Sequence, residues 1–175
     1  MIRRAPLFAL LCLLLAACAT PPALPSRSPP LAWPLSLHVQ RLNEPAEAGQ
    51  PKGLPEDSLL VIQAEGAALR WSLFDPLGVP MARQILEAGE WRHDGLLPPN
   101  PAAREVFAAL LFGLTPDDQV AALYPAADWR READGARVLQ GRWWVKARPG
   151  GGFDLRGPAG ARYRVAPLAA EGAPR

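Results

Sequence analysis

Short runs of alternating apolar and polar residues, each closed by a glycine or proline turn, follow one another through most of this chain. The first covers residues 35–40, where Leu35, Leu37 and Val39 alternate with polar neighbours at the period of a half-buried strand. Further strands are predicted at residues 59–63, 69–74, 79–86, 90–93, 129–133, 137–140, 142–148, 153–156 and 161–165. Strands joined by such short turns pair with their sequence neighbours, so the pattern predicts an antiparallel meander of hairpins.

One stretch between the strands has helical periodicity instead. A first helix is predicted from Asn100 and Pro101, a capping residue followed by proline, to Gly113. Its apolar residues recur at helical spacing at Val106, Phe107, Leu110 and Leu111. A second helix is predicted to start at Thr115 and Pro116, with Asp117 and Asp118 in its first turn, where the helix dipole favours negative charge. Both helices need an apolar partner, so we expect a mainly β (α+β) fold in which the sheet curls around them.

The first 17 residues are typical of a secretory signal. Arg3 and Arg4 precede an apolar run, residues 7–15, that is too short to span a bilayer comfortably. The run ends in Leu15-Ala16-Ala17-Cys18, which resembles a bacterial lipobox, in which the cysteine becomes the acylated mature N-terminus. Acyl chains contribute about 0.8 kcal/mol of membrane affinity per buried methylene. Ala19, where retention in the inner membrane often uses aspartate, favours the outer membrane; the alternative is an ordinary cleaved signal.

The chain divides into four parts on this basis. After the signal peptide (1–17), residues 18–34 are predicted to be an acylated cysteine and a proline-rich tether with a reach of roughly 50 Å. Residues 35–168 are long enough for one domain with a hydrophobic core, and residues 169–175 form a C-terminal tail. Cys12 leaves with the signal and Cys18 is acylated in this interpretation, so no disulfide is expected.

Charge and motifs argue against several classes of function. Removal of Arg3 and Arg4 leaves 17 basic residues against 17 acidic ones, a balance that does not favour a nucleic-acid binder. His38 and His93 are the only histidines, and no metal-ligand spacing, nucleophile elbow or phosphate loop is present. A helix N-terminus accounts for the adjacent acids Asp117 and Asp118. We therefore expect no enzyme activity, no cofactor and no metal site.

The stretch from Leu69 through Phe74-Asp75-Pro76-Leu77-Gly78 to Leu86 resembles a hairpin of the LolA/LolB superfamily of outer-membrane lipoprotein carriers. The helical pair ending in Phe112-Gly113-Leu114 and the strand at Trp129 match in position, so the resemblance covers residues 35–166. The chain more closely resembles a bacterial lipoprotein family that is itself distantly related to LolB and is associated with aryl polyene biosynthesis. The resemblance implies an open, curved antiparallel half-barrel of about nine to eleven strands, with helices covering its concave face.

In that family a leucine in the hairpin loop delivers acylated cargo to the membrane, and the matching loop here is Pro76, Leu77 and Gly78. An exposed leucine contributes about 1.5–3 kcal/mol when it is buried, so Leu77 suits a membrane contact. The alternative is that Leu77 folds back onto the sheet. The chain lacks a clear amphipathic helix before its first strand, which favours a smaller lipid-like cargo over whole lipoproteins.

Large apolar residues suit a cleft between sheet and helices. The predicted cargo cleft consists of Trp71, Trp91, Phe107, Leu110, Leu111, Trp129 and Trp143; the alternative is that these side chains are ordinary core. Residues 136–175 are also strongly basic, with only Asp154 and Glu171 against Arg137, Arg142, Lys146, Arg148, Arg156, Arg162, Arg164 and Arg175. These cations suit phosphate headgroups or, alternatively, solvated edge strands that resist pairing.

Together these patterns predict a monomeric lipoprotein on the periplasmic face of the outer membrane, held there by its N-terminal acyl anchor. It is expected to bind or transfer a lipoprotein, fatty acyl or polyene lipid in an apolar cleft, with a periplasmic donor protein as a possible partner. The alternative is a structural or assembly lipoprotein that contacts a protein partner and carries no lipid.

Overall fold

The computed structural model describes residues 22–43 and 54–168, and it is mainly β. Its strands are β1 (Leu35–Arg41), β2 (Asp57–Glu65), β3 (Ala68–Phe74), β4 (Pro80–Glu87), β5 (Glu90–His93), β6 (Trp129–Arg131), β7 (Arg137–Leu139), β8 (Trp143–Ala147), β9 (Phe153–Arg156) and β10 (Arg162–Pro167). The helices are α2 (Pro101–Leu114), α3 (Val120–Leu123) and the 3-10 turn η1 (Pro158–Gly160). The predicted strands are therefore confirmed, with ends that differ by a few residues.

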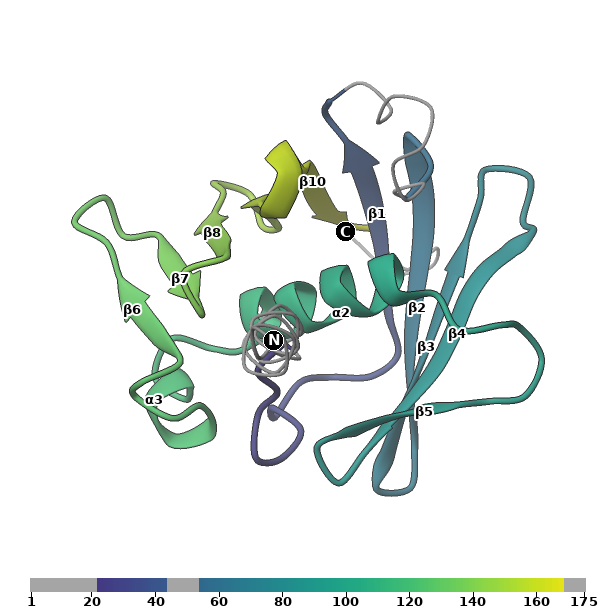
Figure 1. The fold of residues 1–175 in the computed structure, drawn as a ribbon, viewed down its shortest axis with the longest axis horizontal. Helices are drawn as coiled ribbons and strands as arrows, with labels where there is room; N and C mark the ends of the chain where they lie inside the picture. Colours follow the sequence, from purple (N-terminus) through teal and green to yellow (C-terminus); the bar gives the residue numbers. More distant parts are fainter. Residues whose placement is uncertain (1–21, 44–53, 169–175) are drawn as a thin grey trace, which may run out of the picture.

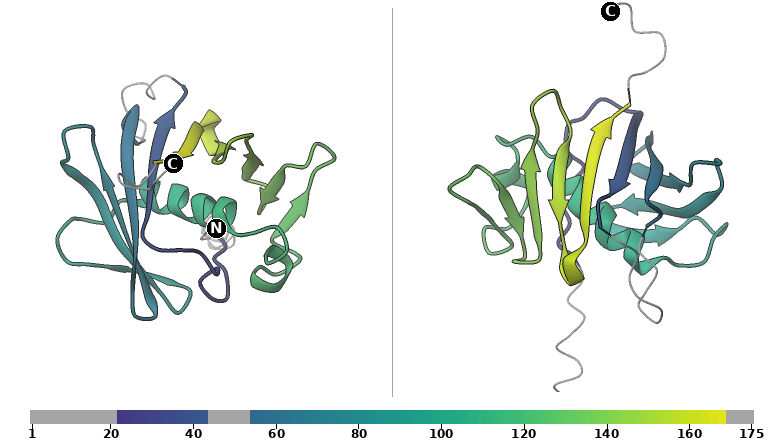
Figure 2. Two further views of the ribbon diagram at one scale, coloured as in Figure 1. Left: turned by 180° about the vertical axis from the view of Figure 1, so that it is seen from behind. Right: turned by 90° about the horizontal axis from the view of Figure 1, so that it is seen from above.

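All of these strands form one antiparallel sheet. The order is β5-β4-β3-β2-β1-β10-β9-β8-β7-β6, and the sheet is open because β5 and β6 are its two edges in the described part of the chain. The first arm, β2–β5, and the second arm, β6–β9, are each a meander of sequence neighbours, as the turn pattern predicted. The two arms meet where β1 pairs with β10 (Figure 2). The register of this pair places Val39 opposite Val165. Figure 1 shows the arms diverging, with α2 lying between them.

The start of α2 follows the sequence, whereas its end does not. Asn100 caps the helix, since its side chain accepts a 3.0 Å hydrogen bond from the Ala103 backbone N–H. The helix continues past Gly113, and Thr115 ends it by donating from both its backbone N–H and its hydroxyl to the Leu111 carbonyl. The predicted helix start at Thr115 is therefore wrong. Because α3 begins only at Val120, Asp117 precedes it and pairs with arginines instead.

The core lies between the sheet and α2. Inward residues of both arms, such as Trp71 of β3 and Leu139 of β7, share one cluster with Val106, Phe107 and Leu110 of α2. An ordinary surface helix buries one stripe of its circumference. In α2, however, every residue from 106 to 112 is buried, so this helix is enclosed on more than the side that faces the sheet.

Candidate functional site

An apolar tip projects from the hairpin between β3 and β4. Leu77 is 87 % exposed, and two further apolar side chains beside it are partly exposed, Val79 at 51 % and Met81 at 41 %. Leu77 therefore does not fold back onto the sheet. We call Leu77, Val79 and Met81 the apolar tip.

Hydrogen bonds hold the loop under the apolar tip in one shape. The Asp75 carboxylate oxygen Oδ1 accepts from the backbone N–H of Leu77 at 2.9 Å and of Val79 at 2.8 Å. The backbone of Asp75 also donates to Val79 and accepts from Gly78, both at 3.0 Å. Gly78 has a φ of +82°, which glycine adopts without strain, and Pro76 has the restricted φ of a turn residue. Leu77 is thus presented to solvent by an ordered turn at Asp75-Pro76-Leu77-Gly78, where the sequence left open whether this leucine is exposed or folds back.

The residues of the predicted cleft lie together, but as packed core. Trp71 contacts the rings of Trp91 and Phe107 at centroid distances of 5.6 and 5.2 Å, where β3, β5 and α2 meet. Trp71, Phe107, Leu110 and Leu111 are fully buried, and Trp143 is 3 % exposed. Trp91 and Trp129 are partly buried and pack against the same core. None of these seven residues lines the pocket beside residues 25–28 or the pocket beside Gly113 and Arg137, both in the described part of the chain.

The segment from residue 22 to 34, which we call the strap, lies against the domain. Pro25 and Pro29 are buried, and Ala23, Leu24 and Trp33 pack against the core. The expectation of a free tether is therefore wrong for residues 22–34. Proline density correctly excluded a helix or strand there, but it carried no information on whether the extended chain would find an apolar surface to cover.

The strap connects the two arms of the sheet. On the side of the second arm, the Ala23 N–H donates to the Gln140 side chain at 3.0 Å and the Ser26 N–H donates to the Leu123 carbonyl at 2.9 Å. On the side of the first arm, the Pro25 carbonyl lies close to Gly89 in the turn between β4 and β5. The strap thus crosses the opening that the curved sheet leaves around α2 (Figure 1).

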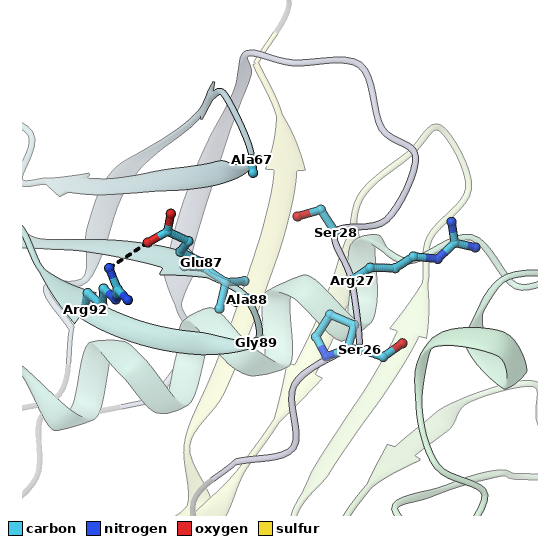
Figure 3. A pocket seen from close by; sticks show the side chains of 10 residues that line it. Ser26, Arg27, Ser28, Ala67, Glu87, Ala88, Gly89 and Arg92 are labelled. Atoms are coloured by element: carbon cyan, nitrogen blue, oxygen red, sulfur yellow. Dashed lines mark ion pairs between the residues drawn. The ribbon is translucent and has the colours of Figure 1, made fainter.

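A pocket of about 510 Å³ separates the strap from the first arm. Its lining consists of Pro25, Ser26, Arg27, Ser28, Ala67, Leu86, Glu87, Ala88, Gly89 and Arg92. Figure 3 shows Ser28 on the side of the strap that faces Ala67 and Glu87, whereas Arg27 extends away from them. Arg92 Nη1 forms an ion pair with Glu87 Oε2 at 2.8 Å. Leu86 is buried and pairs across the strands with Trp91, so the pocket reaches the edge of the aromatic core.

Most of the basic residues from 137 onward have partners that reduce their availability to a headgroup. Asp154 pairs with Arg148 at 3.0 Å and with Arg164 at 3.6 Å. Ion pairs also join Arg142 to Glu105 and Lys146 to Asp134, and Arg156 lies over the ring of Trp144. Arg137 is 7 % exposed and belongs to the interior. Arg175, like the predicted lipidation site Cys18, lies outside the described residues.

Perturbed ionisable groups gather at the C-terminal end of α2. Burial lowers the pKa of Arg137 and raises the pKa of the Tyr124 hydroxyl, and a hydrogen bond from Arg131 lowers the pKa of Asp117. The Arg137 guanidinium donates to the Gly113 and Thr115 carbonyls, both at 2.8 Å, and lies 5.0 Å from the centroid of the Phe112 ring. These contacts satisfy the carbonyls at the end of the helix, which is a structural role.

The two histidines lie on the surface. His38 Nε2 is 2.7 Å from Asp57 Oδ1 on neighbouring strands, and His93 is exposed at the end of β5. Within residues 22–43 and 54–168 there is no group of three or more side chains arranged to hold a metal ion. In the same ranges, none of the helices has both the length and the apolar character needed to cross a membrane.

Sequence reasoning missed three features of this region: the packed strap, the inward Arg137 and the loop-ordering role of Asp75. Only the Asp-Pro-x-Gly pattern signals the last of these, because aspartate at the start of a turn commonly accepts from backbone N–H groups two residues on. Comparisons of the chain with protein-family models, curated proteins and solved structures found no match.

Proposed function

We propose that this protein is a lipoprotein of the outer membrane, anchored through Cys18 and facing the periplasm, that binds or transfers an acyl or polyene lipid. In this proposal the open sheet is a half-barrel of the LolA/LolB type, with α2 over its concave face. The sequence resemblance and the mainly β open sheet support it. The mechanism is passive, since an apolar interior shields the hydrocarbon chain of the lipid while the apolar tip contacts a bilayer.

The apolar tip is the observation that carries the proposal. Leu77 is 87 % exposed on a loop whose hydrogen bonds prevent it from folding back. Burying a leucine side chain in hydrocarbon contributes about 1.5–3 kcal/mol, and Val79 and Met81 add to this surface. An ordered loop also loses little conformational entropy on binding, which favours contact with a partner.

The aromatic core supports a lipid as the cargo. Trp71, Trp91 and Phe107 pack into one aromatic cluster. Leu86, which lines the pocket between the strap and the first arm, pairs across the strands with Trp91 of this cluster. The indole N–H groups of Trp71 and Trp91 are buried, and within the described residues they have no hydrogen-bond partner. A carbonyl or carboxylate oxygen at the end of an acyl chain is an acceptor that suits such donors.

One observation favours the alternative of an assembly lipoprotein that binds a protein partner. The interior is already filled, because five of the seven predicted cleft residues are almost completely buried against one another. In that case the apolar tip contacts a protein, and no lipid enters the domain.

Lipid binding by the full chain distinguishes the two functions. With Cys18→Ser removing the acylation site and Cys12→Ser removing the other thiol, we expect titration with parinaric acid, a fluorescent polyunsaturated fatty acid, to show saturable binding. Native mass spectrometry should show a lipid retained from expression. If both measurements find no lipid, the carrier function is wrong and the assembly function remains.

The membrane contact needs a separate measurement. Leu77→Glu should weaken binding to phospholipid vesicles about tenfold or more, and leave parinaric acid binding unchanged. Leu96→Glu is the matched control, since Leu96 is 67 % exposed outside the apolar tip. Equal losses of vesicle and fatty acid binding in the Leu77 variant would show that the loop is only structural.

A further inference from the structure

The strap is held mainly by apolar contacts. Its side chains Leu24, Pro25 and Trp33 are buried or partly buried against the core, while residues 26–28 are exposed. The hydrogen bonds that join it to the second arm are those of Ala23 and Ser26. It contains Pro22, Pro25, Pro29, Pro30 and Pro34, which have no N–H to leave unsatisfied when the segment moves.

We propose that the strap occupies the cargo site, and that an extended acyl chain binds by displacing it. This inference rests on the proposed carrier function and names where the cargo binds. A bound acyl chain needs space, and the interior formed by Trp71, Phe107 and Leu110 provides none while these side chains stay packed. Releasing the strap uncovers an extended apolar surface over the core without breaking a strand pair or a turn of α2.

The pocket between the strap and the first arm is the entrance. Its volume of about 510 Å³ lies within the range of about 300–1,000 Å³ usual for small-molecule sites. Leu86 lies at its inner side and pairs with Trp91, so a hydrocarbon chain that enters there meets the aromatic core next. Ser26 and Ser28 line its outer side, where the pocket opens to water.

Displacement also changes how far the domain can move from its anchor. With the strap in place, the chain from Cys18 to Ala23 spans at most about 17 Å. With the strap released, the reach from Cys18 to the start of β1 is roughly 50 Å. The apolar tip and the strap pocket lie at opposite ends of the hairpin formed by β3 and β4, so cargo binding gives the tip more freedom to meet a bilayer.

A reversible lock on the strap tests the inference. Ser28 and Ala67 are exposed and line opposite sides of the pocket, so Ser28→Cys and Ala67→Cys can be joined by a short bis-maleimide with a cleavable disulfide. The full chain with Cys12→Ser and Cys18→Ser has no other thiol. Cross-linking should raise the dissociation constant for parinaric acid about tenfold or more, because it removes the binding-competent state. Cleavage of the linker should return the dissociation constant to the value before cross-linking.

Two further variants complete the experiment. Modification of both cysteines with N-ethylmaleimide adds similar bulk to the same pocket without a link, so the linked protein should bind parinaric acid about tenfold or more weakly than the N-ethylmaleimide-treated protein. Leu24→Ser, which weakens the strap contact, should bind parinaric acid more tightly than the parent. Equal affinity in the linked and N-ethylmaleimide-treated proteins would overturn the inference and leave the carrier function intact. No binding in any form would overturn both.

Discussion

Arg137 Nη1 donates a 2.8 Å hydrogen bond to the backbone carbonyl of Thr115, the residue that ends α2. The same guanidinium donates to the Gly113 carbonyl and lies 3.4 Å from Asp117 Oδ1. A strand of the second arm therefore supplies the partner for the end of the helix. Because Arg137 and Thr115 are buried, water has little access to the Thr115 carbonyl in place of the arginine.

Replacement of Arg137 by leucine should destabilise the fold. Arg137→Leu leaves the carbonyl of buried Thr115 and the carbonyl of half-buried Gly113 without their donor, and we expect a loss of about 2–4 kcal/mol in the free energy of unfolding, measured by urea denaturation. Arg130→Leu is the control, since this exposed arginine pairs only at the surface with Glu132, and it should change stability by less than about 0.5 kcal/mol. Similar effects of the two substitutions would contradict the capping role.

Asp75 should control the order of the apolar tip. Asp75→Ala removes the acceptor for the N–H groups of Leu77 and Val79, so both amides should exchange with deuterium faster, at a cost of about 1 kcal/mol in stability. Asp75→Asn keeps an acceptor oxygen and should retain the slow exchange. Unchanged exchange at both amides in the alanine variant would mean that the backbone alone orders the loop.

The Gly113→Ala variant should be less stable than the parent protein, although alanine is a better helix former than glycine. A Cβ at this position would lie 2.7 Å from the Phe153 ring, and such overpacking typically costs about 1–3 kcal/mol. Ala102→Gly, near the other end of α2, should also destabilise, by about 1 kcal/mol through helix propensity. Phe153→Leu should reduce the cost of Gly113→Ala in a double-mutant cycle, and additive effects would exclude the contact as the cause.

Asp117 should make stability depend on pH in the acid range. A hydrogen bond from Arg131 lowers the pKa of this carboxyl below its usual 3.8, so its stabilisation is present at neutral pH and disappears as pH falls through the lowered value. Because Asp117 is mostly exposed, Asp117→Asn should cost less than about 1 kcal/mol at pH 7. Urea denaturation at low pH should show no difference from the parent, and a difference that persists there would have another cause.

Local patterns in the sequence determined the strands, the hairpin turns and the start of α2. Alternation in Leu35, Leu37 and Val39 and the turn residues Pro76 and Gly78 act over a few neighbouring positions, so they could be interpreted without the fold. The exposed position of Leu77 follows from such a turn only in part, since the sequence allowed it to fold back.

Tertiary structure decided everything that depends on contacts between distant residues. Pairing of β1 with β10, the inward turn of Arg137 and the continuation of α2 through Gly113 are decided by partners many positions away. The strap shows the same limit most clearly. Its prolines determined that residues 22–34 are extended, but only the apolar surface left between the two arms determined that they pack, because burial depends on what lies opposite.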